Sequence, residues 1–272
     1  MALETRASLS ESKQSLRPRL APVMANVPRA APTLPSSHVK RAALESEVVR
    51  HLTAANAAGA PYVLTGMVGG GNTLLASSVV RTKEIRQHFR RGIFWVYVGR
   101  EGTDHLQARF DLLAVEIATE INVVPTVHNR FSGLDDVIQH LTLVVAEDAS
   151  RYLIVLDDAW EREVVDTLRP TGLQLLVTTR RGSVVDVAGG RTVVGNMDRE
   201  EARELLKSKS GAETLPETEA DQVAEACGWH ALTLAIVGSL RSVADSPNSA
   251  PAWQKLHSEI VQKKATAHMV CG

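Results

Sequence analysis

Cysteine is scarce in this chain of 272 residues, which holds only Cys227 and Cys271. Two cysteines so far apart cannot provide a disulfide framework or a zinc site. Such cysteine usage is typical of proteins in the reducing cytosol. We therefore expect a cytoplasmic protein.

Long hydrophobic runs and an excess of one charge are also missing. No stretch of 18 apolar residues occurs, which argues against a membrane span. The chain has 30 basic and 31 acidic residues, so we expect no general attraction to nucleic acid or to a membrane surface. Apolar residues make up 44% of the chain, an ordinary value for a globular protein with a buried core.

The first 40 residues contain few acidic and few large apolar side chains. They hold five of the 11 prolines and six basic residues, but only two acidic ones, Glu4 and Glu11. Such a segment buries too little surface to offset the entropy lost on ordering, so we expect residues 1–37 to form a disordered tail. Its composition also resembles that of an organelle transit peptide, which is the alternative interpretation.

From Val39 onward, short apolar stretches alternate with helical patterns. Runs of consecutive apolar residues predict strands of a parallel sheet that is covered on both faces. Apolar residues at helical spacing, beginning with Leu44, Val48 and Leu52, predict helices between them. This alternation predicts a doubly wound α/β domain over residues 38–195. The expected strands are residues 62–64, 93–98, 152–156 and 173–178, with 192–194 as a weaker fifth, and the later helices are 73–89, 105–121 and 134–146.

Strand signals stop after Gly195, and helical signals follow. Asp198 and Glu201 have the spacing of a capping box, which predicts a helix that begins there. Further helices are expected over residues 220–226 and 231–243. We therefore expect a small all-helical subdomain over residues 196–262, followed by a tail over 263–272. The sequence has no internal repeat.

A glycine-rich segment, Gly66-Met-Val-Gly-Gly-Gly-Asn-Thr73, follows the first expected strand. A P-loop consists of a strand, a glycine-rich turn whose amides converge on phosphate oxygens, and the N-terminus of a helix. It also has Lys and then Ser or Thr after its last glycine. Gly66, Gly71 and Thr73 are in register with this pattern, and Asn72 occupies the lysine position. The alternative is a tight turn that binds no ligand.

The missing lysine predicts weak catalysis. Asn72 can donate a hydrogen bond, but it does not supply the charge, and a charged hydrogen bond contributes roughly 1.5–3 kcal/mol. The larger effect is expected on hydrolysis, where the lysine offsets the charge that develops on the transferred phosphoryl group. We therefore expect binding to survive and ATPase activity to be weak or absent. An active ATPase with a charge supplied from elsewhere is a further interpretation.

Two later strands also end in polar residues. Asp157 and Asp158 follow five consecutive apolar residues, and Arg180 follows two threonines. Since ligands of open α/β folds bind at the carboxyl ends of the strands, Asp157 is a candidate ligand for Mg²⁺ and Asp158 a candidate for orienting or deprotonating a water. Arg180 is suited to contact a terminal phosphate. The alternatives are a capping role for Asp157 and a solvated arginine at position 180.

Four motifs in order resemble the NB-ARC family, the nucleotide-binding module of plant disease-resistance proteins and of the animal apoptosome scaffold. They are the degenerate P-loop, residues 152–160, residues 175–180, and the segment Cys227-Gly-Trp-His-Ala-Leu232 in place of the family's Gly-Leu-Pro-Leu-Ala. The resemblance covers about residues 38–257. It implies a P-loop NTPase domain and a helical ARC subdomain that hold ADP at rest and exchange it for ATP on activation.

The resemblance also implies roles for individual residues. Thr73 and Asp157 would hold Mg²⁺, Asp158 would assist hydrolysis, and Arg180 would sense the γ-phosphate. His230 replaces a proline that packs by the adenine in the family; the alternative is that it is only a histidine at a helix end. The predicted nucleotide-binding residues are Arg41, Gly66, Gly69, Gly70, Gly71, Asn72, Thr73, Leu74, Arg180 and His230.

From these features we expect an ADP- or ATP-binding regulatory module with Mg²⁺, acting in defence or cell-death signalling. Its expected partners are other NB-ARC proteins or further copies of itself, with no nucleic-acid or membrane partner. Asn72 and His230 also allow a second hypothesis, a scaffold protein that has lost nucleotide binding. The family's winged-helix domain is not recognisable, so we expect a minimal family member or a truncated gene product.

Overall fold

The computed structural model describes residues 24–54, 59–100, 105–120, 133–184, 190–242 and 247–270. By their internal contacts the residues group into two compact units. Unit 1 comprises the described residues within 1–31, 48–63 and 79–191, and unit 2 those within 32–47, 64–78 and 192–272. The last strand and the helices that follow it thus share a unit with the glycine-rich segment.

The predicted strands are all present. They are β1 (Tyr62–Gly66), β2 (Gly92–Tyr97), β3 (Tyr152–Asp157), β4 (Gln174–Thr179) and β5 (Arg191–Val194). Their order in the sheet is β2-β3-β4-β1-β5, and the β2–β3 and β3–β4 pairs are parallel. The expected α/β class with a doubly wound parallel sheet is therefore confirmed.

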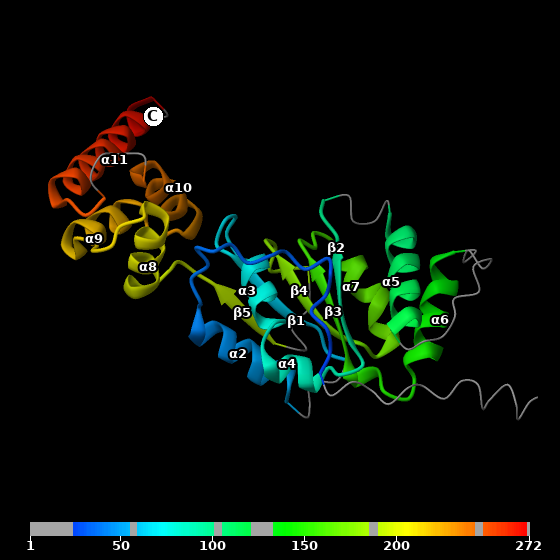
Figure 1. Ribbon diagram of the computed structural model, residues 1–272. Helices are drawn as coiled ribbons and strands as arrows, with labels where there is room; N and C mark the ends of the chain where they lie inside the picture. Colours follow the sequence, from blue (N-terminus) through cyan, green and yellow to red (C-terminus); the bar gives the residue numbers. More distant parts are fainter. Residues whose placement is uncertain are drawn as a thin grey trace, which may run out of the picture. The chain divides into compact units, whose positions relative to one another are not determined.

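Both faces of the sheet in unit 1 are buried. Alternate residues of a strand point to opposite faces. Phe94, Ile154 and Leu175 belong to one core cluster with apolar side chains of the helices α5 (Leu106–Glu120), α6 (Leu134–Val145) and α7 (Arg162–Leu168). Figure 1 shows α5 and α6 side by side, and the two helices are in contact. On the opposite face Trp95, Leu153 and Leu176 are also buried, which explains why the strands are apolar at consecutive positions.

The prediction of one helix over residues 73–89 is wrong. The structure has two helices there, α3 (Asn72–Val79) and α4 (Lys83–His88). Thr82 separates them, because its side chain accepts a hydrogen bond from the backbone N–H of Ile85 and so caps α4. Its hydroxyl also donates to the carbonyl of Val79, the last residue of α3. The apolar periodicity continues through this break, so the sequence pattern does not reveal it.

The predicted disorder is also wrong for the later part of the tail. Residues 1–23 lie outside the described residues, whereas residues 24–37 are described. Ala25 is buried, and its backbone N–H and carbonyl both hydrogen-bond to Arg86, at 2.7 Å each. Pro32 accepts a hydrogen bond from the hydroxyl of Ser77. Hydrogen bonds from its backbone to residues far along the chain therefore order a segment whose composition suggests disorder.

Unit 2 ends in a group of helices. They are α8 (Arg199–Ser210), α9 (Glu217–Ala226), α10 (Ala231–Ser242) and α11 (Ala250–Val270), and α8 contacts both α9 and α10 (Figure 1). Their core includes Leu206, Leu234 and the fully buried Trp253, together with Val39 from the segment before α2 (Ala42–Leu52). The all-helical character expected after Gly195 is present. α11 continues to Val270, past residue 262, where we expected the helical subdomain to end.

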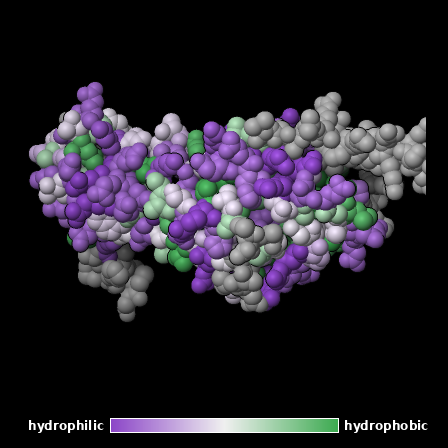
Figure 2. All heavy atoms as spheres, turned by 90° about the horizontal axis from the view of Figure 1, so that it is seen from below, coloured by the Kyte–Doolittle hydropathy of each residue, from purple (hydrophilic) through white to green (hydrophobic). Residues whose placement is uncertain are grey.

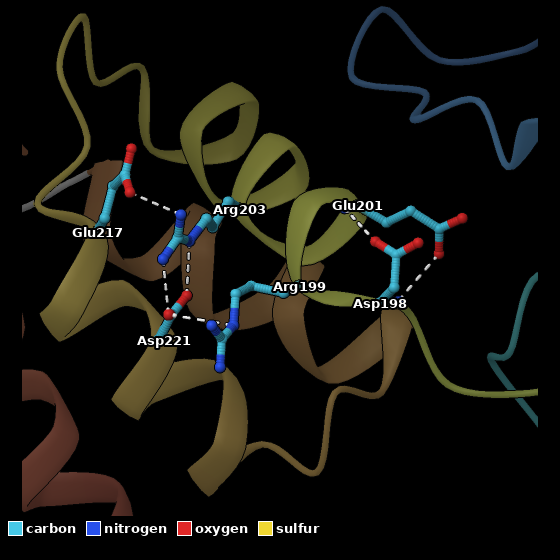
Figure 3. Close-up of polar contacts among 6 residues, drawn as sticks. All are labelled: Asp198, Arg199, Glu201, Arg203, Glu217 and Asp221. Carbon is cyan, nitrogen blue, oxygen red and sulfur yellow. Dashed lines mark hydrogen bonds and ion pairs between the residues drawn. The ribbon is translucent and has the colours of Figure 1, made fainter.

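Figure 3 shows two sets of polar contacts made by α8: one caps its N-terminus, and the other joins it to α9. The predicted capping box is formed: Glu201 N–H donates to the carboxylate of Asp198, and Asp198 N–H donates to that of Glu201. On the same helix, Arg203 binds both carboxylate oxygens of Asp221 of α9 at 2.7 Å. Arg203 also donates to Glu217, so one guanidinium joins α8 to two carboxylates of α9.

The face of the molecule seen in Figure 2 is mostly hydrophilic, and its hydrophobic residues lie in small separate groups. Scattered apolar residues of this kind are normal on protein surfaces. In the part of the chain that the structure describes, no helix combines the length and the apolar character needed to cross a bilayer.

The Arg203–Asp221 pair predicts a pH-dependent contribution to stability. The hydrogen bonds from Arg203 lower the pKa of Asp221 below its ordinary value of 3.8. A carboxylate whose pKa is lowered by folding stabilises the fold above its unfolded pKa, and this contribution is lost as the pH falls through the folded pKa. Asp221→Asn should therefore lower the melting temperature by a few degrees at neutral pH, and the difference from the unmodified protein should shrink below about pH 4.

Glu225→Gln is the control, because it removes an exposed carboxylate from the same helix. It should leave the melting temperature nearly unchanged at each pH, as measured by circular dichroism. An equal loss in both variants at neutral pH would contradict the role of the pair.

Candidate functional site

The predicted site residues are distributed over both units. Unit 2 holds the glycine-rich loop with Asn72, Thr73 and Leu74, and it also holds Arg41 and His230. Unit 1 holds Asp157, Asp158 and Arg180. In unit 2 the structure brings His230 to the loop, whereas the contacts of Arg41 are with Gly195, Asn196 and Glu201. In unit 1 it brings Asp158 and Arg180 together.

The glycine-rich loop is a tight turn between β1 and α3. The N–H of Gly70 donates to the carbonyl of Met67 at 3.0 Å, and Gly71 accepts the first hydrogen bond of α3, from Leu75, at 2.8 Å. Gly69 and Gly71 have φ values of +76° and +103°, in the region that favours glycine. A Cβ atom at Gly71 would meet no atom within 4 Å, so there is open space beside the loop where α3 begins. Thr73 and Leu74 follow in the first turn of this helix.

Gly66 permits a close approach at the end of β1. A Cβ atom there would lie 2.5 Å from the carbonyl oxygen of Val194 and 2.7 Å from the side-chain oxygen of Asn72. Asn72 is the first residue of α3, and its side-chain amide therefore lies against the end of β1. A P-loop lysine would instead supply a positive charge from this position.

The loop is held against the N-terminus of α10. The N–H of Leu232 donates to the carbonyl of Gly69 at 3.2 Å. One ring nitrogen of His230, Nε2, lies 2.8 Å from the carbonyl oxygen of Val68, and the other, Nδ1, lies 3.0 Å from the hydroxyl of Thr233. Because a carbonyl only accepts, Nε2 carries the proton in the first of these bonds. His230 is thus a helix-end histidine, as one interpretation expected, and it also bonds to the loop.

A Schellman motif places His230 at this position. At the end of α9, the N–H of Trp229 donates to the carbonyl of Ala224 and that of Gly228 to Glu225, at 2.9 and 2.8 Å. Gly228 has φ +63°, as the motif requires, and Trp229 has φ +56°. His230 follows directly and accepts the first hydrogen bond of α10, from Leu234. The degenerate Cys227–Leu232 segment therefore ends one helix, begins the next and supplies both contacts to the loop.

Arg41 forms a clamp within unit 2. Its guanidinium donates to the carbonyls of Gly195 and Asn196 at 2.9 and 2.8 Å, and its Nε donates to Glu201 at 3.0 Å. Its side chain is only 11% exposed. Glu201 is also the second partner in the capping box, so Arg41 fixes the chain between β5 and α8.

In unit 1, the carboxylates at the end of β3 are organised by a threonine of β4. The Thr178 hydroxyl donates to Asp157 at 2.6 Å and accepts from the N–H of Asp158 at 2.9 Å. Asp157 and Thr178 are both buried. Asp158 has φ +57°, a left-handed conformation that aspartate adopts more readily than most residues. The sequence identified hydroxyls at this strand end, but it did not identify Thr178 as the partner of Asp157.

Arg180 contacts Asp158 and an aromatic ring that the sequence analysis did not single out. Its Nε lies 3.3 Å from the Asp158 carboxylate, and its guanidinium carbon lies 5.4 Å from the centre of the Trp160 ring. The guanidinium groups of Arg100 and Arg181 also lie over this ring, at 4.5 and 5.4 Å. Asp158, Trp160, Arg180 and Arg100 line a cavity of about 390 Å³.

The magnesium ligands predicted from the sequence, Thr73 and Asp157, belong to unit 2 and unit 1, respectively. Among the described residues, no group of three or more His, Cys, Asp or Glu side chains could hold a metal ion. Mg²⁺ in phosphate-binding sites is commonly held by one or two protein ligands together with phosphate oxygens and water. A buried carboxylate such as Asp157 and a hydroxyl such as Thr73 are of the appropriate chemical type.

The contact between the loop and α10 predicts different effects for two glycine substitutions. A Cβ atom at Gly69 would lie 2.6 Å from Cβ of Leu232, whereas one at Gly71 has open space. Both positions have positive φ, so Gly69→Ala and Gly71→Ala share the backbone strain, and only the first adds a clash. Gly69→Ala should therefore lose about 1–3 kcal/mol more of the free energy of unfolding, as measured by urea denaturation. Equal losses would mean that the loop does not pack on α10.

The chain is similar to several known proteins. The NB-ARC domain family matches residues 42–216. Apoptotic protease-activating factor 1 of Rattus norvegicus is 27% identical over 224 residues, which are 80% of this chain and 17% of that protein. The disease susceptibility protein LOV1 of Arabidopsis thaliana is 26% identical over 221 residues, 72% of this chain and 22% of that protein. The chain thus spans about a fifth of the length of these relatives, or less.

Solved structures support the fold. A STAND protein with a tetratricopeptide-repeat sensor from Pyrococcus horikoshii matches with a TM-score of 0.52 at 19% identity, over 86% of this chain and 33% of that chain. The family match covers more than half of the chain and includes the strands, the glycine-rich loop and the paired carboxylates. The predicted resemblance is therefore confirmed, and the chain belongs to the NB-ARC family of nucleotide-binding signalling modules.

Proposed function

We propose that the protein is a regulatory switch that binds ADP at rest and ATP when activated, with weak or absent hydrolysis. The observation that carries this proposal is the loop between β1 and α3, where two glycines with positive φ lead into a helix N-terminus beside open space. A loop of this form presents backbone amides and the helix dipole to an anion. In an NB-ARC chain, the diphosphate of a nucleotide is the expected anion.

Asn72 accounts for the proposed loss of hydrolysis. Phosphate binding depends on several backbone amides, which the substitution leaves in place. The lysine charge acts mainly on the transition state, where negative charge develops on the transferred group. Binding therefore weakens by roughly one to two orders of magnitude, whereas turnover loses its main electrostatic stabilisation.

The remaining roles are proposed from positions in the family motifs. Thr73 and Asp157 serve Mg²⁺, which when bound neutralises phosphate charge, and Arg180 senses the γ-phosphate. Asp158 orients a water for the residual hydrolysis. The hydrogen bond from Thr178 supports the role of Asp157, because it fixes the carboxylate in one orientation. Arg41 supports the nucleotide site indirectly, since its donors are used by Gly195, Asn196 and Glu201.

We also propose the domain division of residues 38–195 and 196–262 into nucleotide-binding and ARC-like parts, a cytoplasmic location, and a role in defence or cell-death signalling. The relatives named above support the last point through their functions in apoptosis and plant disease. Self-association or association with other NB-ARC proteins completes the proposal.

Isothermal titration with ADP and Mg²⁺ tests the nucleotide site. We expect saturable binding that requires the loop, and therefore a loss of binding in Asn72→Asp, which places a negative charge at the start of α3. No heat at millimolar ADP would overturn the proposal.

Restoring the lysine should strengthen binding. Asn72→Lys should lower the dissociation constant for ADP about tenfold or more, because it restores a charged hydrogen bond to phosphate. Gln222→Lys is the matched control: it adds the same charge to unit 2 at an exposed position of α9 and should change the constant little. Equal effects of the two variants would show that the loop does not act as a P-loop.

A second candidate function is that of a nucleotide-free interaction protein. Leu232, Ile236 and Leu240 are about half exposed or more and recur every fourth residue along α10, so they form an apolar stripe. Met67 and Val68 of the loop are exposed as well. Thermal melts separate the two functions, because a ligand that binds only the folded state raises the melting temperature. A melting temperature unaffected by ADP, together with concentration-dependent association, would favour this alternative.

A further inference from the structure

The cavity in unit 1 is lined by more positively than negatively charged side chains, as far as its lining residues are described. Among the residues that the structure describes, three guanidinium groups line it, those of Arg100, Arg109 and Arg180, and one carboxylate does, that of Asp158. Arg109 donates to the carbonyls of Tyr97 and Val98, which holds it in the wall of the cavity. Like charges gathered at one site repel each other, and an anion relieves this repulsion.

Trp160 orients two of these cations, Arg100 and Arg180, and also Arg181, which is not among the lining residues. Arg100 lies 4.5 Å from the ring centre, and Arg180 and Arg181 each lie 5.4 Å from it, all within the range of a cation–π interaction. A guanidinium that stacks by its face keeps N–H groups at its edge, in the planar fork that suits phosphate or carboxylate oxygens. The ring thus holds the guanidinium N–H groups in place for a ligand and does not neutralise their positive charge.

The indole group supplies a further unsatisfied donor. Trp160 lines the cavity, and its Nε1 atom is buried and has no hydrogen-bond partner in the described parts of the protein. A buried N–H without an acceptor is uncommon, because it has lost its hydrogen bond to water. An oxygen atom from a bound ligand is the simplest acceptor for it.

From these observations we propose that the cavity bounded by Arg100, Trp160 and Arg180 is a binding site for a compact oxyanion of the phosphate or pyrophosphate class. Its volume of about 390 Å³ is near the lower end of the range for small-molecule sites. The excess of cationic over anionic groups favours a ligand with at least two negative charges. The site is formed within unit 1 and does not include the glycine-rich loop, but it shares Arg180 and Asp158 with the proposed nucleotide site and adds Arg100 and Trp160 to them.

Calorimetric titration of the full chain with inorganic pyrophosphate, without a nucleotide, tests this site. We expect saturable binding that Arg100→Ala weakens about tenfold or more, the effect of losing one charged hydrogen bond. Arg90→Ala, which removes an exposed arginine elsewhere in unit 1, should have little effect. Trp160→Phe, which keeps an aromatic ring and removes the indole N–H, should weaken binding severalfold.

Parallel titrations with ADP distinguish this site from the nucleotide site. Asn72→Asp should abolish ADP binding, together with any pyrophosphate binding at the loop, and leave unchanged the pyrophosphate binding that Arg100→Ala weakens. If Asn72→Asp abolishes both and Arg100→Ala affects neither, pyrophosphate binds at the loop and the inference fails while the proposed function stands. If pyrophosphate gives no heat, or if Arg100→Ala and Arg90→Ala weaken binding equally, the inference also fails. Pyrophosphate binding without ADP binding would support the inference and overturn the proposed function.

Discussion

The packing of the glycine-rich loop against the start of α10 is the contact on which unit 2 depends. Residues about 160 positions apart meet there through two kinds of bond, from a backbone amide to Gly69 and from a histidine ring to Val68. Both bonds require a glycine at position 69, because the Cβ atom of Leu232 occupies the space that a side chain there would need. The conformation of the loop is therefore determined by the helical part of unit 2 as well as by its own glycines.

The local features of the fold could be predicted because each has a local cause. The strands of the sheet are apolar at consecutive positions since both faces are covered, and the capping box of Asp198 and Glu201 spans only three residues. Two differences between the structure and the prediction have different causes: in one a residue distant in the sequence orders the chain, and in the other a local cap is hidden by the apolar pattern. Arg86 orders the backbone at Ala25, which composition cannot indicate, and the cap at Thr82 interrupts an apolar periodicity that continues through it.

The same distinction applies to the candidate site. Asp157, Asp158 and Arg180 were identified because polar residues directly follow apolar strands. Thr178 was not assigned a role, because only the register of β3 and β4 brings its hydroxyl to Asp157. Arg100 lies in no recognised motif, and Trp160 ends the motif of residues 152–160 but was assigned no role there. Their relation appears only when three guanidinium groups are found over one ring.

The left-handed backbone at Asp158 has a consequence for interpreting its carboxylate. Few residue types adopt a positive φ without strain. Aspartate is therefore favoured at position 158 on conformational grounds, apart from any chemistry it performs. Asparagine is comparably tolerant of the same path and carries no charge. Replacing Asp158 by asparagine therefore removes the charge and keeps the backbone conformation. Replacing it by alanine would change both at once.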